Sequence, residues 1–333
     1  MPQDKRISDV DLLTEQGLQE FRDGSHSKSI DTFEWVLEID PRNEHAFALR
    51  IESLRFLKNH EQAGREIERA LKLLPDSVEL RNERGRWHYD QERYKEAAAA
   101  FDEVLQVDPK NEDALQGKIS SLRILKNYDE AGQEIEQALR LLPDSVAIRN
   151  ERGRWHGSQE RYKEAAAAFD EVLRIDPKNE DALQRKIKSL RLLEDYNEAG
   201  QEIERALRLL PDSVAIRNEH GRWHYEQKRC REAAAAFEEV LQIDPKNEDA
   251  LQGKIASLRV LKNYDEAGRE IERALRLFPD SVAIRNQRGR WHYDQEHYKE
   301  AAAAFDEVLQ IAPKNEYALQ GKVKSLRLLK DDE

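Results

Sequence analysis

Residues 78–145 decide the fold, and they read VELRNERGRWHYDQERYKEAAAAFDEVLQVDPKN (78–111) followed by EDALQGKISSLRILKNYDEAGQEIEQALRLLPDS (112–145). Nearly the same text returns at 146–213, at 214–281 and from 282 almost to the end. A more divergent copy precedes them at 10–77, where Gly17 stands in the place of Gly85. We number these five modules in chain order. The last four share a tryptophan that marks their register: Trp87, Trp155, Trp223 and Trp291. A repeat of fixed period in this range predicts a solenoid.

Each module consists of two halves of 34 residues, since Tyr94 and Tyr128 stand 34 apart, as do Pro109 and Pro143. Each half predicts two antiparallel helices. In 112–145, Asn111 is a suitable N-cap for the first helix, and apolar residues then recur at helical spacing. Pro143 ends the second helix, because the residue before a proline disfavours the helical region. We expect this second helix to bury Ala131, Ile135 and Ala138.

One half on its own buries too little apolar surface to offset the entropy of ordering it, so the halves must stack. The prediction is an all-α fold, an α-solenoid of antiparallel helix pairs. A flexible N-terminus (1–9) and a short tail (331–333) flank a single array at 10–330. The expected repeats are 10–43, 44–77, 78–111, 112–145, 146–179, 180–213, 214–247, 248–281 and 282–315, followed by a capping helix at 316–330.

The composition narrows the range of partners. The net charge of −12 opposes binding to nucleic acid or to an anionic membrane, since both need a basic field. Cys230 is the only cysteine, which excludes a disulfide framework and a cysteine-based metal site. Its counterparts in other modules are tyrosines, so we interpret it as a tolerated substitution in or near the core. No segment reads as a signal peptide or a membrane span, and we expect a cytoplasmic protein.

The repeats resemble the tetratricopeptide repeat (TPR) family. In 78–111 the residues that carry the resemblance are Gly85, Tyr94, Ala97, Phe101, Val104 and Pro109. In 112–145 they are Ile119, Tyr128, Ala131, Ile135, Ala138 and Pro143. The resemblance covers about 10–330. It implies a right-handed superhelix, with positions 2, 5, 6, 9, 12 and 13 of each repeat facing a concave groove.

On this implied mapping, position 5 of every repeat from 78 onward carries an amide. The set is Asn82, Gln116, Asn150, Gln184, Asn218, Gln252, Asn286 and Gln320. An amide offers both a donor and an acceptor, so a ladder of amides could hold the backbone of an extended peptide of any sequence. The alternative is that these are neutral, soluble groups copied along with each module.

Arginines run beside the amides. Position 9 of the odd repeats gives Arg86, Arg154, Arg222 and Arg290, and position 12 of the even repeats gives Arg123, Arg191, Arg259 and Arg327. Arginine binds carboxylates with two parallel hydrogen bonds, which would suit an acidic ligand. An equally favoured alternative is a groove of internally paired charges, because position 6 of three odd repeats is acidic: Glu83, Glu151 and Glu219.

Three tyrosines at position 12 of odd repeats, Tyr89, Tyr225 and Tyr293, are candidate anchors for a partner. In the third module Gly157 and Ser158 replace the tyrosine and the acid, so we expect a more open groove there. The chaperone-tail-binding members of the family hold a carboxylate with Lys and Asn at set positions. Asn or Gln occupies position 5 here, which speaks against that specificity.

Signs of catalysis are lacking. One histidine recurs in each of four modules at position 11, where the family normally packs its side chain: His88, His156, His224 and His292. No phosphate-binding glycine loop, catalytic triad or metal-ligand spacing occurs, so we expect no cofactor, no metal and no enzyme activity. The leading hypothesis is a scaffold that binds an extended segment of another protein. The alternatives are a regulatory or targeting arm of a larger, possibly enzymatic protein, and a scaffold that self-associates weakly through its ends.

Overall fold

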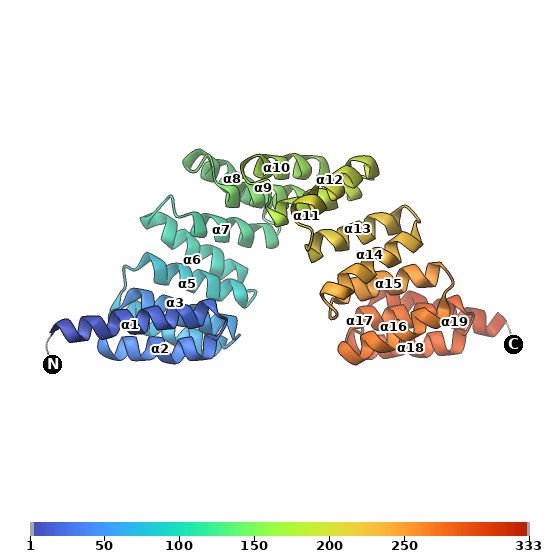
Figure 1. The fold of residues 1–333 in the computed structure, drawn as a ribbon, viewed down its shortest axis with the longest axis horizontal. Helices are drawn as coiled ribbons and strands as arrows, with labels where there is room; N and C mark the ends of the chain where they lie inside the picture. Colours follow the sequence, from blue (N-terminus) through green and yellow to red (C-terminus); the bar gives the residue numbers. More distant parts are fainter. Residues whose placement is uncertain (1–2, 332–333) are drawn as a thin grey trace. The chain divides into compact units, whose positions relative to one another are not determined.

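The computed structural model describes the backbone of residues 3–331 and the side chains of residues 10–330. Every regular element in this part of the chain is an α-helix (Figure 1), so the predicted all-α solenoid is confirmed. The first nine helices are α1 (Gln3–Arg22), α2 (His26–Ile39), α3 (Glu44–Phe56), α4 (His60–Leu73), α5 (Val78–Asp90), α6 (Tyr94–Val107), α7 (Glu112–Ile124), α8 (Tyr128–Leu141) and α9 (Val146–Ser158).

The remaining helices continue the pattern of one pair per repeat. They are α10 (Tyr162–Ile175), α11 (Glu180–Leu192), α12 (Tyr196–Leu209), α13 (Val214–Glu226), α14 (Cys230–Ile243), α15 (Glu248–Val260), α16 (Tyr264–Leu277), α17 (Val282–Asp294), α18 (Tyr298–Ile311) and α19 (Glu316–Asp331). Helix α1 begins before the expected start of the array at 10. Residues 1–2 of the expected flexible N-terminus and 332–333 of the expected tail lie outside the described residues.

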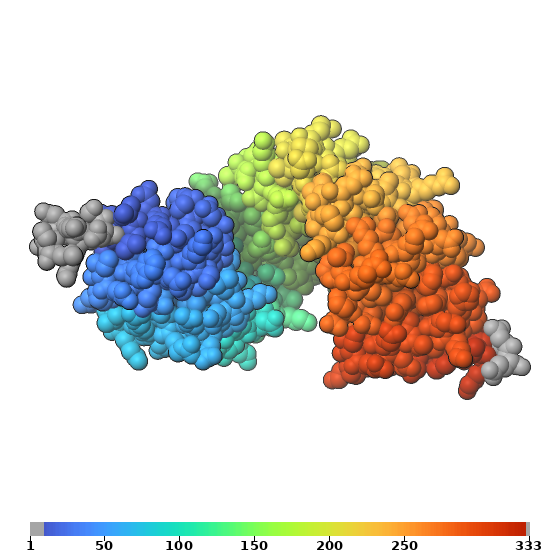
Figure 2. Space-filling view, turned by 60° about the horizontal axis from the view of Figure 1, so that its bottom comes forward, coloured from blue at the N-terminus to red at the C-terminus, as the bar shows by residue number. Residues whose placement is uncertain are grey.

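The chain divides into two units, Met1–Ala168 and Phe169–Glu333, and the division falls within α10. The first unit contains α1 to α9, and the second contains α11 to α19. Within each unit the repeats stack in chain order, as the space-filling view shows (Figure 2).

The predicted cap is confirmed at the start of α7. The side chain of Asn111 accepts a hydrogen bond from the backbone N–H of Ala114 at 3.0 Å. The next repeat uses serine in the same way, since Ser145 accepts from Ile148 at 3.0 Å. These bonds satisfy a donor that the first turn of a helix leaves free, so they fix the residue at which each first helix begins.

The turn between the two helices of a repeat contains a residue in the left-handed conformation. In the first repeat this residue is Gly24, with φ of 72°. The later repeats place a lysine or glutamate there, with φ between 56° and 63°: Lys58, Glu92, Lys126, Glu160, Glu194, Lys228, Lys262 and Glu296. A residue with a side chain is strained at positive φ, so each of these eight turns lowers the free energy of unfolding by a small amount.

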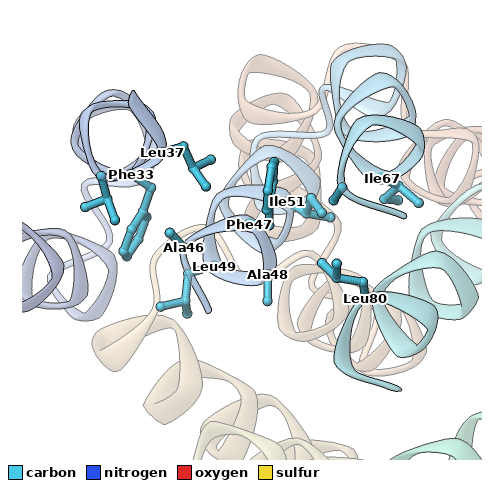
Figure 3. Packing of buried hydrophobic residues seen from close by; sticks show 11 residues of the cluster. Phe33, Leu37, Ala46, Phe47, Ala48, Leu49, Ile51, Ile67 and Leu80 are labelled. Carbon is cyan, nitrogen blue, oxygen red and sulfur yellow. The ribbon is translucent and has the colours of Figure 1, made fainter. Parts of the chain in front are cut away.

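Figure 3 shows how the core forms at the amino-terminal end of the first unit. Phe33 and Leu37 of α2 pack on one side of α3, where Phe47 is wholly buried. Ile67 of α4 and Leu80 of α5 pack on the other side. Helix α3 is therefore enclosed by α2 before it and by α4 and α5 after it. The predicted burial of Ala131, Ile135 and Ala138 is likewise confirmed.

Two kinds of interface alternate along the stack, and phenylalanine forms the first. The buried ring of Phe101 lies between Gly85 of its own repeat and Gly117 of the next. A Cβ atom added to Gly85 would stand 2.6 Å from the ring, and one added to Gly117 would stand 2.4 Å from it. Both glycines are required here because they leave room for the ring.

Tryptophan forms the second kind of interface, between an even repeat and the odd repeat after it. The ring of Trp155 packs on Gly132, where a Cβ would stand 2.8 Å from it. Its indole N–H donates to the backbone carbonyl of Tyr128 at 2.9 Å. Trp87, Trp223 and Trp291 make the same pair of contacts in their modules. In the second, fourth and fifth modules both kinds of interface are present, so the packing there follows the two-repeat period of the sequence.

Candidate functional site

Three of the four asparagines at position 5 are buried within the stack. Asn82, Asn150 and Asn218 are between 6% and 8% exposed. The side-chain N–H of Asn82 donates to the Oδ1 atom of Asn111 at 3.0 Å, and Asn218 donates to Asn247 at 3.2 Å. Since Asn111 and Asn247 are N-caps of the following helices, these bonds align one repeat with the next. Asn286 is half-buried.

The glutamines at position 5 have a different environment. Gln116 and Gln252 are half-buried and line surface pockets, and exposed Gln320 lines a third. Gln184 is half-buried in the third module. The asparagines and glutamines therefore differ: Asn82 and Asn218 bond the N-caps of the next repeat, whereas Gln116, Gln252 and Gln320 line surface pockets.

The three pockets are built to one plan. Each lies where an odd repeat meets the even repeat after it. The second-module pocket has a volume of about 280 Å³ and is lined by Arg55, Arg86, Tyr89, Asp90, Phe101, Asp113, Gln116, Gly117, Ser120 and Arg154. The fourth-module pocket, of about 230 Å³, is lined by Arg222, Tyr225, Glu226, Phe237, Asp249, Gln252, Gly253, Ala256 and Gln287. The fifth-module pocket, of about 200 Å³, is lined by Arg290, Tyr293, Asp294, Phe305, Tyr317, Gln320, Gly321 and Lys324.

Glycine at position 6 of the even repeat opens these pockets. Because Gly117 has no side chain, the otherwise buried ring of Phe101 contributes to the pocket lining. Gly253 and Gly321 stand in the same relation to the phenylalanines of their modules. In the third module the sequence has Arg185 at this place, whose guanidinium pairs with Asp181 at 2.6 Å.

The three candidate tyrosines all reach pockets. Tyr89 is half-buried and packs edge-on against Tyr94, with ring centroids 5.2 Å apart. Tyr293 contacts Tyr298 in the same manner. Tyr225 is exposed, and Cys230 stands where a second ring would support it. Burial raises the pKa of Tyr89 above its ordinary value. A tyrosine hydroxyl can both donate and accept a hydrogen bond.

The arginines take part in internal ion pairs, which supports the alternative of paired charges for most of them. The nearly buried carboxylate of Glu83 pairs with Arg55 at 2.7 Å and with Arg86 at 2.5 Å. Arg55 also bonds Asp90 at 2.7 Å, and Arg86 bonds Asp113 at 2.7 Å. Burial alone would lower the pKa of Arg55, but Glu83 and Asp90 outweigh that effect and raise it. The charges along this face therefore hold adjacent repeats together.

The same arrangement recurs at the other junctions. Glu151 pairs with Arg123 at 3.3 Å and also with Arg154, while Ser158 stands where the second acid would be. In the second unit Glu219 pairs with Arg191 at 2.9 Å and with Arg222 at 2.7 Å. Arg222 bonds Asp249 at 2.9 Å, as Arg86 bonds Asp113.

Arg55 is a residue of this network that the sequence analysis did not single out. It stands 68 residues before Arg123 and occupies the same position of its repeat. The divergent text of the first module conceals the match, which aligning the modules would have shown. Arg55 and Asp90 also line a further hollow of about 450 Å³, together with Glu52, Phe56, Lys58 and His60.

The network changes at the fifth module. Gln287 replaces the glutamate, and Arg259 donates to its Oε1 atom at 2.8 Å and pairs with Asp294. Arg290 lies over the ring of Tyr317, 5.8 Å from its centroid. Among the described residues Arg290 has no ion pair, and exposed Arg327 has none either.

The recurring histidines pack against the tryptophans beside them, with ring centroids 4.7 to 4.8 Å apart. Burial lowers the pKa of each, most for His224, which falls to about 4 because His220 and Arg229 add to the effect. The described residues contain no cluster of three or more side chains placed to bind a metal ion. They also contain no helix long and apolar enough to cross a membrane.

Comparison with known proteins agrees with this architecture. A family model described as tetratricopeptide repeat matches residues 49–112, 119–180 and 257–316, and a second model of the same description matches 158–218. Human DnaJ homolog subfamily C member 7 is 22% identical over 353 residues, which cover 97% of this chain and 71% of that protein.

Solved structures show the same fold at low identity. The APC/C hetero-tetramer Cut9-Hcn1 matches with a TM-score of 0.61 and 17% identity, over 95% of this chain and 56% of that one. The human IFIT1 dimer with m7Gppp-AAAA matches with a TM-score of 0.63 and 16% identity, over 99% of this chain and 88% of that one. At this level of identity the similarity concerns the architecture of stacked helix pairs.

Proposed function

Because the chain belongs to the tetratricopeptide repeat family, we propose that it is a non-catalytic scaffold that binds an extended segment of another protein. The observation that carries the proposal is the recurrence of one pocket design at the second, fourth and fifth modules. Each pocket offers a tyrosine, a glutamine amide and part of a phenylalanine ring. Rigid aromatic anchors beside a few polar groups are typical of surfaces that bind side chains of a partner.

The residues of each pocket would contact different parts of the bound segment. The glutamines Gln116, Gln252 and Gln320 would hold the backbone of the segment, because each amide both donates and accepts. The tyrosines would contact its side chains. The paired arginines would act mainly by keeping adjacent repeats, and so adjacent pockets, at a fixed spacing. The buried asparagines support the same spacing through the N-caps.

The net negative charge of the chain favours a protein over a nucleic acid as its partner. One similar structure holds the capped RNA m7Gppp-AAAA, but a net charge of −12 opposes binding of a phosphate backbone. A similar structure from the APC/C is an assembly of protein chains, which agrees with a protein partner. We therefore propose a protein segment as the ligand, and no binding of nucleic acid, membrane or cofactor. We also propose that the protein is located in the cytoplasm.

A peptide selected on the immobilised full-length chain from a random displayed library tests the proposal. Its affinity is then measured by calorimetry for the wild type and for Tyr225→Ala combined with Gln252→Ala. We expect the double variant to weaken binding about tenfold or more. Glu272→Ala, an exposed position on α16, is the control and should leave the affinity unchanged. Equal affinity in the pocket variant and the control would refute binding at these pockets.

A second candidate function is self-association, and α19 favours it. Val323 is 65% exposed on this helix, and Leu319 and Leu326 are also exposed. Apolar side chains gathered on one helix favour contact with a second copy. Light scattering of the full chain tests this. A mass that rises with concentration, and that Val323→Glu returns to that of a monomer, would support it, whereas a constant monomeric mass would exclude it.

A further inference from the structure

The fifth-module pocket differs from its two counterparts in charge. In the fourth module, two carboxylates neutralise Arg222: Glu219 at 2.7 Å and Asp249 at 2.9 Å. In the second module, Glu83 and Asp113 neutralise Arg86 in the same way. In these two pockets the positive charge of the arginine is therefore already neutralised by its acidic partners, and it is not available to an anionic ligand.

Both acidic partners are replaced in the fifth module. Gln287 stands where Glu219 stands in the fourth module, and Tyr317 stands where Asp249 does. The guanidinium of Arg290 consequently has no ion pair among the described residues and lies over the exposed ring of Tyr317. An arginine stacked on an aromatic ring keeps its N–H groups available for a carboxylate.

A third substitution adds positive charge. Lys324 lines the pocket at the place of Ala256, and it has no ion pair within the described part of the chain. The one carboxylate of the lining, Asp294, is paired with Arg259. Two cations without acidic partners thus border a pocket of about 200 Å³, in a chain whose net charge is −12. A hollow below about 300 Å³ has room for a side chain rather than for a larger ligand.

We infer that the fifth-module pocket is an anion-binding subsite that receives the carboxylate of an acidic side chain, Asp or Glu, from the bound segment. The inference rests on the proposed function and specifies the chemistry of one position of its ligand. Arg290 and Lys324 bind the carboxylate, Tyr293 and Tyr317 contact the carbons of the side chain, and Gln320 holds the adjacent backbone. The fourth-module pocket, whose charges are already paired, receives an uncharged side chain.

Fluorescence anisotropy at low ionic strength tests this inference on the full-length chain. The probe is a fluorescent hexaglutamate peptide whose ends are acetylated and amidated, so that its only carboxylates are on side chains. We expect Arg290→Ala combined with Lys324→Ala to weaken its binding about tenfold or more, as the loss of charge-assisted hydrogen bonds predicts. Arg222→Ala, the matched position of the fourth module, should change it less than about twofold. Circular dichroism checks that each variant keeps its helix content.

A second variant tests whether the absence of the two carboxylates is what allows this pocket to bind an anion. Gln287→Glu combined with Tyr317→Asp restores the two carboxylates of the fourth module, and we expect it to abolish hexaglutamate binding without removing either cation. Equal binding of a capped hexaglutamine peptide, or equal losses from the Arg222 and Arg290 variants, would overturn the inference. A library-selected peptide that still binds, while hexaglutamate does not, would overturn this inference alone. Failure of both probes would reject the proposed function as well.

Discussion

Arg55 and Glu83 form an ion pair of 2.7 Å across the boundary between two repeats, although the side chain of Glu83 is only 3% exposed. A buried carboxylate is costly unless it is paired, and Arg86 supplies the second partner. Adjacent repeats are therefore joined by charge as well as by their apolar faces. The pair makes the stability of each boundary sensitive to single substitutions on either side.

Removal of Arg55 should destabilise the chain strongly. Arg55→Ala leaves Glu83 buried with one partner, and we expect a loss of about 3 kcal/mol in the free energy of unfolding. Urea denaturation followed by circular dichroism measures it. Glu83→Gln should cost less, because Gln287 already faces Arg259 in this chain. Arg65→Ala is the control, since its pair with Glu61 is exposed and should contribute less than about 0.5 kcal/mol. A loss as small as that of the control would contradict the assigned role of Arg55.

Addition of one methyl group at Gly117 should also be costly. A Cβ there would stand 2.4 Å from the ring of Phe101, so Gly117→Ala forces the two repeats to shift. We expect a loss of about 1–3 kcal/mol, measured from thermal unfolding. At Gly157 a Cβ meets no atom within 4 Å, and Gly157→Ala should be neutral or raise stability by up to about 1 kcal/mol. Similar effects of the two substitutions would show that close approach of the ring is unimportant.

The strained turns offer a stabilising change. Glu92 has a φ of 59°, where Gly24 stands in the first repeat. Glu92→Gly should relieve the strain and raise the free energy of unfolding by up to about 1 kcal/mol. Gly24→Ala, the reverse change, should lower it by a similar amount. The midpoint of urea denaturation checks both, and effects of the same sign in the two variants would contradict the assignment of strain.

His224 should make the stability of the second unit depend on pH. Burial, His220 and Arg229 hold its pKa at about 4 in the folded state, whereas an unfolded histidine has a pKa near 6.5. The unfolded chain therefore binds a proton first as the pH falls. The contribution of the neutral His224 ring to the free energy of unfolding is complete above about pH 6.5. It decreases as the pH falls toward 4, and at pH 5 it is smaller by about 2 kcal/mol.

Two measurements check the role of His224. Titration of its ring by NMR should give a midpoint well below that of a free histidine, and His220→Ala should raise that midpoint. Urea denaturation should show a smaller difference between pH 5 and neutral pH in His224→Gln than in the wild type. A normal midpoint for the His224 ring would remove the basis of this prediction.

Most of the fold could be predicted from the sequence because its determinants are local and repeated. Asn111 and Pro143 delimit helices through backbone geometry that depends on immediate neighbours. The period then fixes the packing, since Ala131 must face the same environment in each copy. The start of α1 at Gln3 was missed, because the residues before 10 are polar and carry no helical periodicity.

The site was harder to predict than the fold. The position-5 amides resemble one another in sequence, but Asn82 bonds an N-cap while Gln116 lines a pocket. That difference depends on Gly117, which leaves the surface open beside the glutamine. Pairing of the arginines was one of two equally favoured alternatives, because the reach of Arg55 to Glu83 depends on how two repeats stack. Sequence position alone does not fix such contacts between repeats.

The alternation of the phenylalanine and tryptophan interfaces sets a parity rule for the length of the array. Deletion of the single repeat 112–145 would bring Glu151 to the place of Gly117, where its side chain would collide with the ring of Phe101. Deletion of the two consecutive repeats 146–213 instead leaves Gly117 beside Phe101 and brings Trp223 to the place of Trp155 beside Gly132, so both kinds of contact stay intact. Arrays of this sequence can therefore grow or shrink without defects only by an even number of repeats.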